Sequence, residues 1–79
     1  MDINEEKIDE SALALLYHTL HDKDRAWKQI DWDVMNRLYE KGMILNPQGK
    51  AKSVVLTDEG LMKSEVLFKH LFTKPKEIE

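Results

Sequence analysis

The sequence predicts one small α+β domain that is mostly helical, with a β-hairpin in its C-terminal half followed by a final helix. Apolar residues recur at the three- to four-residue spacing of amphipathic helices in three stretches, near residues 5–21, 32–41 and 58–72. Between the last two, short apolar runs flank Asn46-Pro47-Gln48-Gly49, whose residues suit a type I turn. We therefore expect residues 1–79 to form a single domain, with residues 1–4 and 74–79 as frayed tails.

The first helix is expected near residues 5–21. Asn4 followed by Glu5 and Glu6 makes an acidic start, which interacts favourably with the positive end of a helix dipole. A 3.6-residue stripe then follows, made of Ile8, Ala12, Leu15, Leu16, Thr19 and Leu20. We expect this stripe to be the buried face of the helix.

Residues 24–30 form a short element whose type stays open. Asp24 can cap a helix of one to two turns with Trp27 and Ile30 directed inward, whereas AWKQI can also form a strand. We favour the short helix. In both cases the segment is short for the first helix of a helix-turn-helix, which weighs against DNA binding.

A helix near residues 32–41 has the clearest boundaries. Asp31 suits the N-cap position, because its carboxylate can accept from free backbone N–H groups in the first turn. Its apolar face consists of Val34, Met35 and Leu38. Gly42 can adopt the left-handed conformation that ends a helix, so that Met43 packs on Leu38 as in a Schellman motif.

Residues 43–45 and 53–56 are expected to pair as an antiparallel hairpin with an exposed basic tip at Lys50 and Lys52. Thr57 then caps the last helix. Gly60 costs about 1 kcal/mol there relative to Ala, which suggests that the helix approaches the hairpin closely. The residues expected in the core are Leu15, Leu16, Leu38, Ile44, Leu56 and Phe68.

The segment LYEKGMI, the hairpin and the segment VLTDEG resemble the recognition helix, wing and LTxxG start of winged-helix regulators, over residues 34–60. The chain is more similar still to a family of short uncharacterised bacterial proteins, a domain of unknown function, with RAWK, DWD, EKG and GKAKSVVLT segments. That similarity runs from about residue 8 to residue 72. The resemblance to winged-helix regulators implies a winged-helix-like fold, and the similarity to the uncharacterised family implies no assigned activity.

The composition of the chain limits the kinds of functional site and the cellular location that we expect. The chain has no cysteine, which excludes a disulfide framework, a thiol nucleophile and a cysteine-based zinc site. Its start lacks the basic and apolar regions of a signal peptide, and no apolar run approaches membrane-spanning length. We expect a soluble, cytoplasmic protein without a membrane partner. A chain of 79 residues buries only about 60–65% of its unfolded surface, so self-association would stabilise it.

Charge is distributed unevenly along the chain. The formal net charge is −3, yet residues 25–56 hold six basic and three acidic side chains. An alternative function is therefore a DNA-binding transcriptional regulator, in which Asn36 and Arg37 of the 31–41 helix enter the major groove and Lys50 and Lys52 contact phosphates. Acidic residues beside the same phosphates weigh against this alternative.

Three further groups have a structural and a functional interpretation. His18 and His21, near Asp22 and Asp24, could share a metal, but histidines at a helix end also suit the negative end of the dipole, and we favour the second interpretation. Trp27 and Trp32 could stack on bases or bind a partner, but burial in a small core is favoured. Catalysis is not expected, because the serines suit surface positions: Ser11, Ser53 and Ser64.

The last helix is apolar around much of its circumference, more than one contact face requires. One stripe can close the core, and the other would stay exposed in a monomer. We therefore expect a homodimer, with another protein as a further possible partner. The candidate interface residues are Leu61, Met62, Val66, Phe68, Leu71 and Phe72, with Lys63, Glu65 and Lys69 as a mixed rim. The leading hypothesis is a non-enzymatic, winged-helix-like interaction module without a cofactor.

Overall fold

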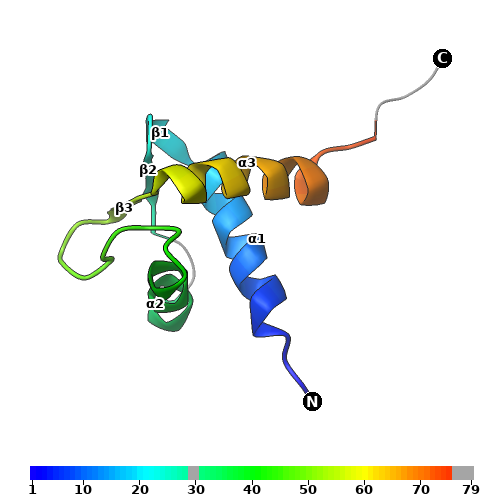
Figure 1. Ribbon diagram of the computed structural model, residues 1–79, viewed down its shortest axis with the longest axis horizontal. Helices are drawn as coiled ribbons and strands as arrows, with labels where there is room; N and C mark the ends of the chain where they lie inside the picture. The colour runs from blue at the N-terminus through cyan, green and yellow to red at the C-terminus, as the bar shows by residue number, and fades with distance from the viewer. Residues whose placement is uncertain (29–30, 76–79) are drawn as a thin grey trace.

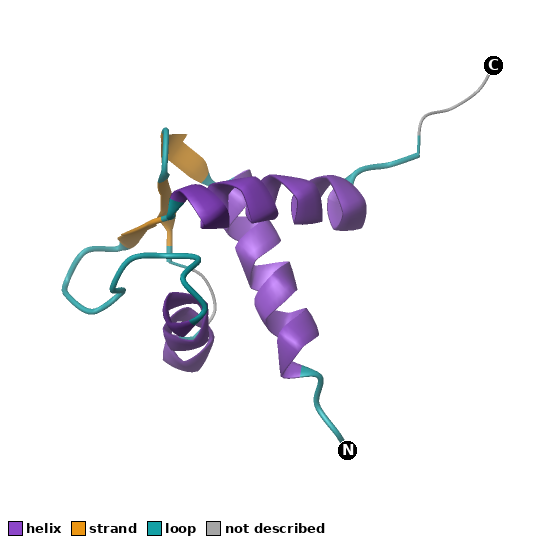
Figure 2. Ribbon diagram, viewed as in Figure 1, coloured by secondary structure: helices purple, strands orange, loops and turns teal. Residues whose placement is uncertain are grey.

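The computed structural model describes residues 1–28 and 31–75. In chain order the elements are α1 (Glu5–His18), β1 (Leu20–Asp22), β2 (Arg25–Trp27), α2 (Trp32–Glu40), β3 (Ser53–Val55) and α3 (Asp58–Phe72). The strands form an antiparallel sheet in the order β1-β2-β3 beside the helices (Figures 1 and 2). The mostly helical α+β class is thus confirmed, and the arrangement is compatible with a winged-helix-like fold. Part of the predicted C-terminal tail, residues 76–79, lies outside the described residues.

Helix α1 begins where the acidic start predicts and ends three residues early. The Asn4 side chain accepts from the backbone N–H of Lys7 at 3.1 Å. After His18 the chain turns into β1, because Leu20 pairs with Ala26 of the next strand. Its buried side chains are Asp9, Ala12, Leu13, Ala14 and Leu16. The predicted stripe is therefore displaced: Ile8 is exposed and Leu15 is only half-buried.

The short helix favoured for residues 24–30 is wrong over its described part, because residues 25–27 form the central strand. Strand β2 pairs with β1 on one side and β3 on the other, so both edges of its backbone find partners. Ala26 points into the core and is fully buried, while Trp27 on the opposite face is exposed. Ile30, also expected to point inward, lies outside the described residues.

Helix α2 has the predicted caps. Asp31 accepts from the N–H of Val34 at 3.1 Å. At the other end Gly42 has φ +78°, and the Met43 N–H donates to the Leu38 carbonyl at 2.9 Å. These are the left-handed residue and the six-to-one bond of a Schellman motif, and both Met43 and Leu38 are buried.

The predicted antiparallel pairing across residues 43–56 is confirmed but short. It consists of a bridge between Ile44 and Leu56, with the Leu45 N–H donating to the Val55 carbonyl at 2.8 Å. The regular partner of β3 is instead β2, a segment for which a short helix was favoured over a strand. The connecting loop is held partly by Pro47, whose side chain is fully buried.

Helix α3 starts at the Thr57 cap, whose hydroxyl accepts from the Gly60 N–H at 3.0 Å. It crosses α1 beside the sheet, while the N-terminal end of α1 and the C-terminal end of α3 extend away from the strands in different directions (Figure 1). Because the two helices diverge, Leu15 and Phe68 are only half-buried, contrary to expectation. The other predicted core residues are buried: Leu16, Leu38, Ile44 and Leu56.

Candidate functional site

The outer face of α3 carries an exposed apolar pair. Met62 and Val66, four residues apart and therefore on one face, are 71% and 66% exposed. Glu59 and Lys63 border the same shallow, open hollow. On the opposite side of the helix Gly60 and Ser64 are buried. The core therefore leaves this outer face uncovered.

The other four residues of the predicted dimer interface lie elsewhere on α3. Leu61 packs against the core cluster and is only partly buried. Phe68 is half-buried, and Leu71 and Phe72 are exposed at the C-terminal end of the helix. The six candidates thus divide between an inner face, an outer face and a helix end.

An aromatic cluster joins the ends of α1 and α3. The Phe68 ring lies 5.3 Å from Tyr17, 5.5 Å from His18 and 6.0 Å from Phe72, measured between centroids. His18 stacks on Phe68 with an interplanar angle of 11°. An open hollow of about 220 Å³ is bordered by Leu15 and members of this cluster. The cluster holds the two diverging helices together where the core ends.

The two histidines considered for a metal have separate partners. His18 stacks on Phe68, whereas His21 stacks on Trp27 at 4.6 Å. Across residues 1–28 and 31–75 the side chains form no group of three or more histidine, cysteine or carboxylate ligands that could hold a metal ion.

The four residues assigned to nucleic-acid contact lie in two places. Lys50 and Lys52 are exposed in the loop before β3. Asn36 is half-buried on α2. The guanidinium of Arg37 faces α1, where it donates to both carboxylate oxygens of Asp9 at 2.9 and 2.8 Å. The two lysines are therefore accessible, while the arginine already has a partner.

Asp9 is a buried charge that was not predicted from the sequence. Its side chain is 2% exposed and accepts from Arg37 and from the ammonium of Lys41, which lies 2.8 Å away. Glu5 adds a weaker, exposed contact to Arg37 at 3.2 Å. Burial raises the pKa of Asp9, but the hydrogen bonds from Arg37 and Lys41 outweigh it, and the pKa lies below its usual value. This network ties α1 to α2.

The burial of Asp9 could have been predicted from the sequence. Asp9, Ala12, Leu13 and Leu16 follow the i, i+3, i+4, i+7 spacing of a single helix face. Ile8, which begins the predicted stripe, lies one residue away from this face and is exposed. A carboxylate in line with three apolar residues indicates a buried acid that needs a cation.

An exposed group of side chains surrounds the end of β2 and the start of α2, and we call it the tryptophan face: His21, Trp27, Lys28 and Trp32 with the loop lysines Lys50 and Lys52. Trp27 and Trp32 are 52% and 53% exposed, so the prediction that they fill the core is wrong. The short chain makes its core from aliphatic side chains instead. Each indole ring has one neighbour, His21 at Trp27 and Lys28 at Trp32, and about half of each tryptophan stays exposed.

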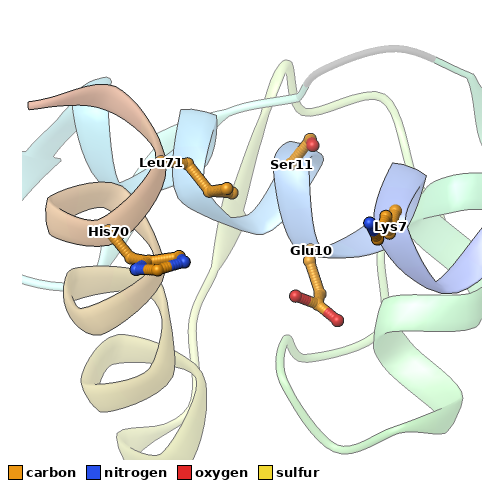
Figure 3. Close-up of a pocket in the computed structure, with 5 residues that line it drawn as sticks. All are labelled: Lys7, Glu10, Ser11, His70 and Leu71. Atoms are coloured by element: carbon orange, nitrogen blue, oxygen red, sulfur yellow. The ribbon is translucent and has the colours of Figure 1, made fainter.

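A hollow of about 200 Å³ lies between α1 and α3. Figure 3 shows His70 and Leu71 extending from α3 toward α1, with Glu10 extending from α1 into the same space. Lys7 and Ser11 complete its border. The third serine, Ser64, is fully buried rather than at the surface, and its hydroxyl donates to the Leu61 carbonyl at 2.8 Å.

None of the helices within residues 1–28 and 31–75 is both long and apolar enough to cross a membrane.

Comparison with known proteins gives one family and one close relative. Residues 4–74 match the family described as a domain of unknown function, DUF6429. The chain is also similar to the uncharacterized protein y4hR of Sinorhizobium fredii (strain NBRC 101917 / NGR234). The two are 55% identical over 74 residues, which cover 94% of this chain and 100% of the relative. No solved structure matches the chain.

Proposed function

Because this chain belongs to the DUF6429 family of domains of unknown function, we propose a function from its own exposed surfaces. In this proposal the chain is a non-enzymatic, winged-helix-like interaction module that pairs with a second copy of itself through the outer face of α3. The observation that carries this proposal is the exposure of Met62 and Val66 side by side on a helix whose other face is buried. Isologous pairing is the commonest way for identical chains to cover such a patch.

The charge pattern of α3 supports an antiparallel arrangement. Its first turn is acidic, with Asp58 and Glu59, and its last turn is basic, with Lys69 and His70. A two-fold axis midway between residues 62 and 66 places Met62 of one copy against Val66 of the other. The same axis brings Glu59 next to Lys69 of the partner. Both the apolar pair and the charged ends are then self-complementary, and the helix dipoles oppose each other.

A binding role also agrees with the hydrogen bonds of two buried polar side chains. The Ser64 hydroxyl is occupied by a backbone carbonyl, and the Asp9 carboxylate is occupied by two cations. These interactions stabilise the fold. The exposed apolar and aromatic side chains on α3 and near the sheet suit partner recognition.

Sedimentation equilibrium over a hundredfold concentration range tests the proposal. We expect the wild-type mass to rise from the 9.3 kDa monomer toward the dimer. Met62→Glu or Val66→Glu should keep the chain monomeric, because a charge in the centre of the interface loses its hydration. Leu45→Glu, at an exposed apolar position outside α3, is the matched control. A wild type that stays monomeric throughout contradicts the proposal.

Duplex DNA binding is the second candidate function, and the exposure of Lys50 and Lys52 favours it. Arg37 counts against it, because reaching a groove would require leaving Asp9. Titration of a labelled duplex at low salt is the test. If the lysines contact phosphates, binding weakens with salt, and Lys50→Ala together with Lys52→Ala reduces the slope.

A further inference from the structure

Both tryptophans of this chain belong to the tryptophan face, where Trp27 has an imidazole beside it and Trp32 has an ammonium group beside it. The chain has two tryptophans in all, and each is more than half exposed. The imidazole of His21 stacks on Trp27 with centroids 4.6 Å apart. The ammonium of Lys28 lies 5.0 Å from the centroid of the Trp32 ring. Large exposed indoles held in place by neighbours are preorganised to stack on another flat ring.

Lys28 connects the two tryptophans to the basic loop. Its ammonium donates to the Gly49 carbonyl at 3.3 Å, and its backbone N–H donates to the Lys52 carbonyl at 2.8 Å. Lys50 follows Gly49 directly, so both loop lysines lie beside the strand that carries Trp27. Within the described residues neither loop lysine forms an ion pair. The loop that carries these two lysines is thus bound to Lys28, whose ammonium lies next to the Trp32 ring.

The acidic residues near the tryptophan face include a helix cap and a residue of a paired strand. Asp31 caps α2 by accepting from Val34, so its charge is balanced by the helix dipole. Asp33 is exposed in the first turn of the same helix. Asp22 lies across the strand pair from Arg25. The loop side of the face, around Gly49, contains lysines and no carboxylate.

We propose that the tryptophan face binds single-stranded nucleic acid, with Trp27 and Trp32 stacking on unpaired bases and Lys28, Lys50 and Lys52 contacting the phosphates. Stacking requires bases whose faces are free, which a duplex does not offer. An acidic peptide would satisfy the lysines but would leave the indole faces without a matching ring. This binding uses a different surface from α3 and does not rest on the pairing proposed above.

Tryptophan fluorescence tests the proposal directly, because the only fluorescent indoles lie on the proposed site. The full chain is titrated at low salt with oligothymidine and oligouridine of about twenty nucleotides. We expect saturable quenching with at least one of them, and the two arms distinguish DNA from RNA. The logarithm of the affinity should fall linearly with the logarithm of the salt concentration. Lys50→Ala and Lys52→Ala should each reduce that slope by about 0.7.

Substitutions distinguish the contribution of ring stacking to binding from the contribution of positive charge. Trp27→Leu and Trp32→Leu, followed by anisotropy of a labelled oligonucleotide, should each weaken binding at least about fivefold, while Trp27→Phe retains most of it. Both positions are exposed, so the circular dichroism of the variants should match the wild type. Lys7→Ala and Lys74→Ala, each of which removes one positive charge as the loop-lysine variants do, are the controls. Lys7 lies near the start of α1 and Lys74 follows the end of α3, and these two helix ends extend away from the strands (Figure 1).

Four results would overturn the proposal. They are absence of quenching at low salt, leucine variants that bind like the wild type, a duplex that binds as tightly as the single strands, and equal quenching by polyglutamate. The second would leave only electrostatic attraction, and the fourth would indicate a protein partner instead.

Discussion

The backbone of α3 at Gly60 lies directly against the carbonyl group of Met43. A Cβ atom added to Gly60 would overlap the Met43 oxygen and lie 2.8 Å from its carbonyl carbon. The same oxygen accepts from the Thr57 N–H at 3.0 Å and from the Thr57 hydroxyl at 3.1 Å. The close approach inferred from a glycine in a first helical turn is therefore confirmed. It fixes the start of α3 on the end of α2.

Gly60→Ala should destabilise the protein by about 1–3 kcal/mol, because the new methyl group displaces a rigid backbone. This loss overrides the gain of about 1 kcal/mol that alanine usually brings to a helix. Urea denaturation measures the difference. Lys63→Ala, on the exposed side of the same helix, is the control and should change stability by less than about 0.5 kcal/mol. A Gly60→Ala variant more stable than wild type would contradict the observed contact.

Leu38→Ala should cost about 2–5 kcal/mol, because Leu38 is buried in the core and also makes the apolar contact of the Schellman motif with Met43. Leu45→Ala provides the same chemical change at an exposed position, and it should have little effect. Thermal and urea unfolding of both variants gives the comparison. A cost below about 1 kcal/mol at Leu38 would mean that the buried face of α2 is misassigned.

Asp9 should make the stability of the protein sensitive to acid. Its pKa is lowered in the folded state, so the ionised form stabilises the fold above the unfolded pKa near 3.9, and this contribution is lost as the pH falls through the folded value. Asp9→Asn should therefore cost about 1–3 kcal/mol at neutral pH, where two partly exposed cations lose their partner. At low pH the difference from wild type should become small.

Urea denaturation at pH 7 and at about pH 2 measures this linkage. Glu5→Gln is the control, because Glu5 contacts the same arginine from an exposed position. Its effect should be small at both pH values. Equal differences between Asp9→Asn and wild type at the two pH values would argue against an ionised Asp9 as the source.

Charge reversal tests the antiparallel geometry of the proposed dimer. Glu59→Lys or Lys69→Glu alone should weaken pairing about three- to thirtyfold, because each substitution places like charges together twice across a two-fold axis. The double variant should recover most of the affinity, since the opposite charges face each other again. Sedimentation equilibrium measures all three. A double variant as weak as the single ones would exclude this orientation.

The elements that the sequence predicted correctly are those with local signals. The caps at Asp31, Gly42 and Thr57 depend on residues within one helical turn, so their patterns are visible in the chain. Strand β2 has no such signal. Ala26 becomes a central strand residue only because Val54 pairs with it from a distant part of the sequence. Single-sequence periodicity cannot contain that information.

The exposed surfaces also divide into those that local sequence patterns predict and those that depend on distant residues. Exposure of Met62 and Val66 could be expected, because helical spacing separates them from the core stripe. The exposure of Trp27 could not, because it depends on which face of β2 the sheet turns outward. The partnership of Asp9 with Arg37 joins two helices, and only the packing of those helices makes it apparent.

The pairing of α1 with α3 has a consequence for synthesis. These two helices come from opposite ends of the sequence and share the most extensive contact between any two elements. Until α3 has emerged from the ribosome, α1 lacks the element with which it makes its most extensive contact. Folding of this domain is therefore expected to be completed only after residues 58–72 have been synthesised, and exposed apolar side chains of α1 are open to aggregation until then.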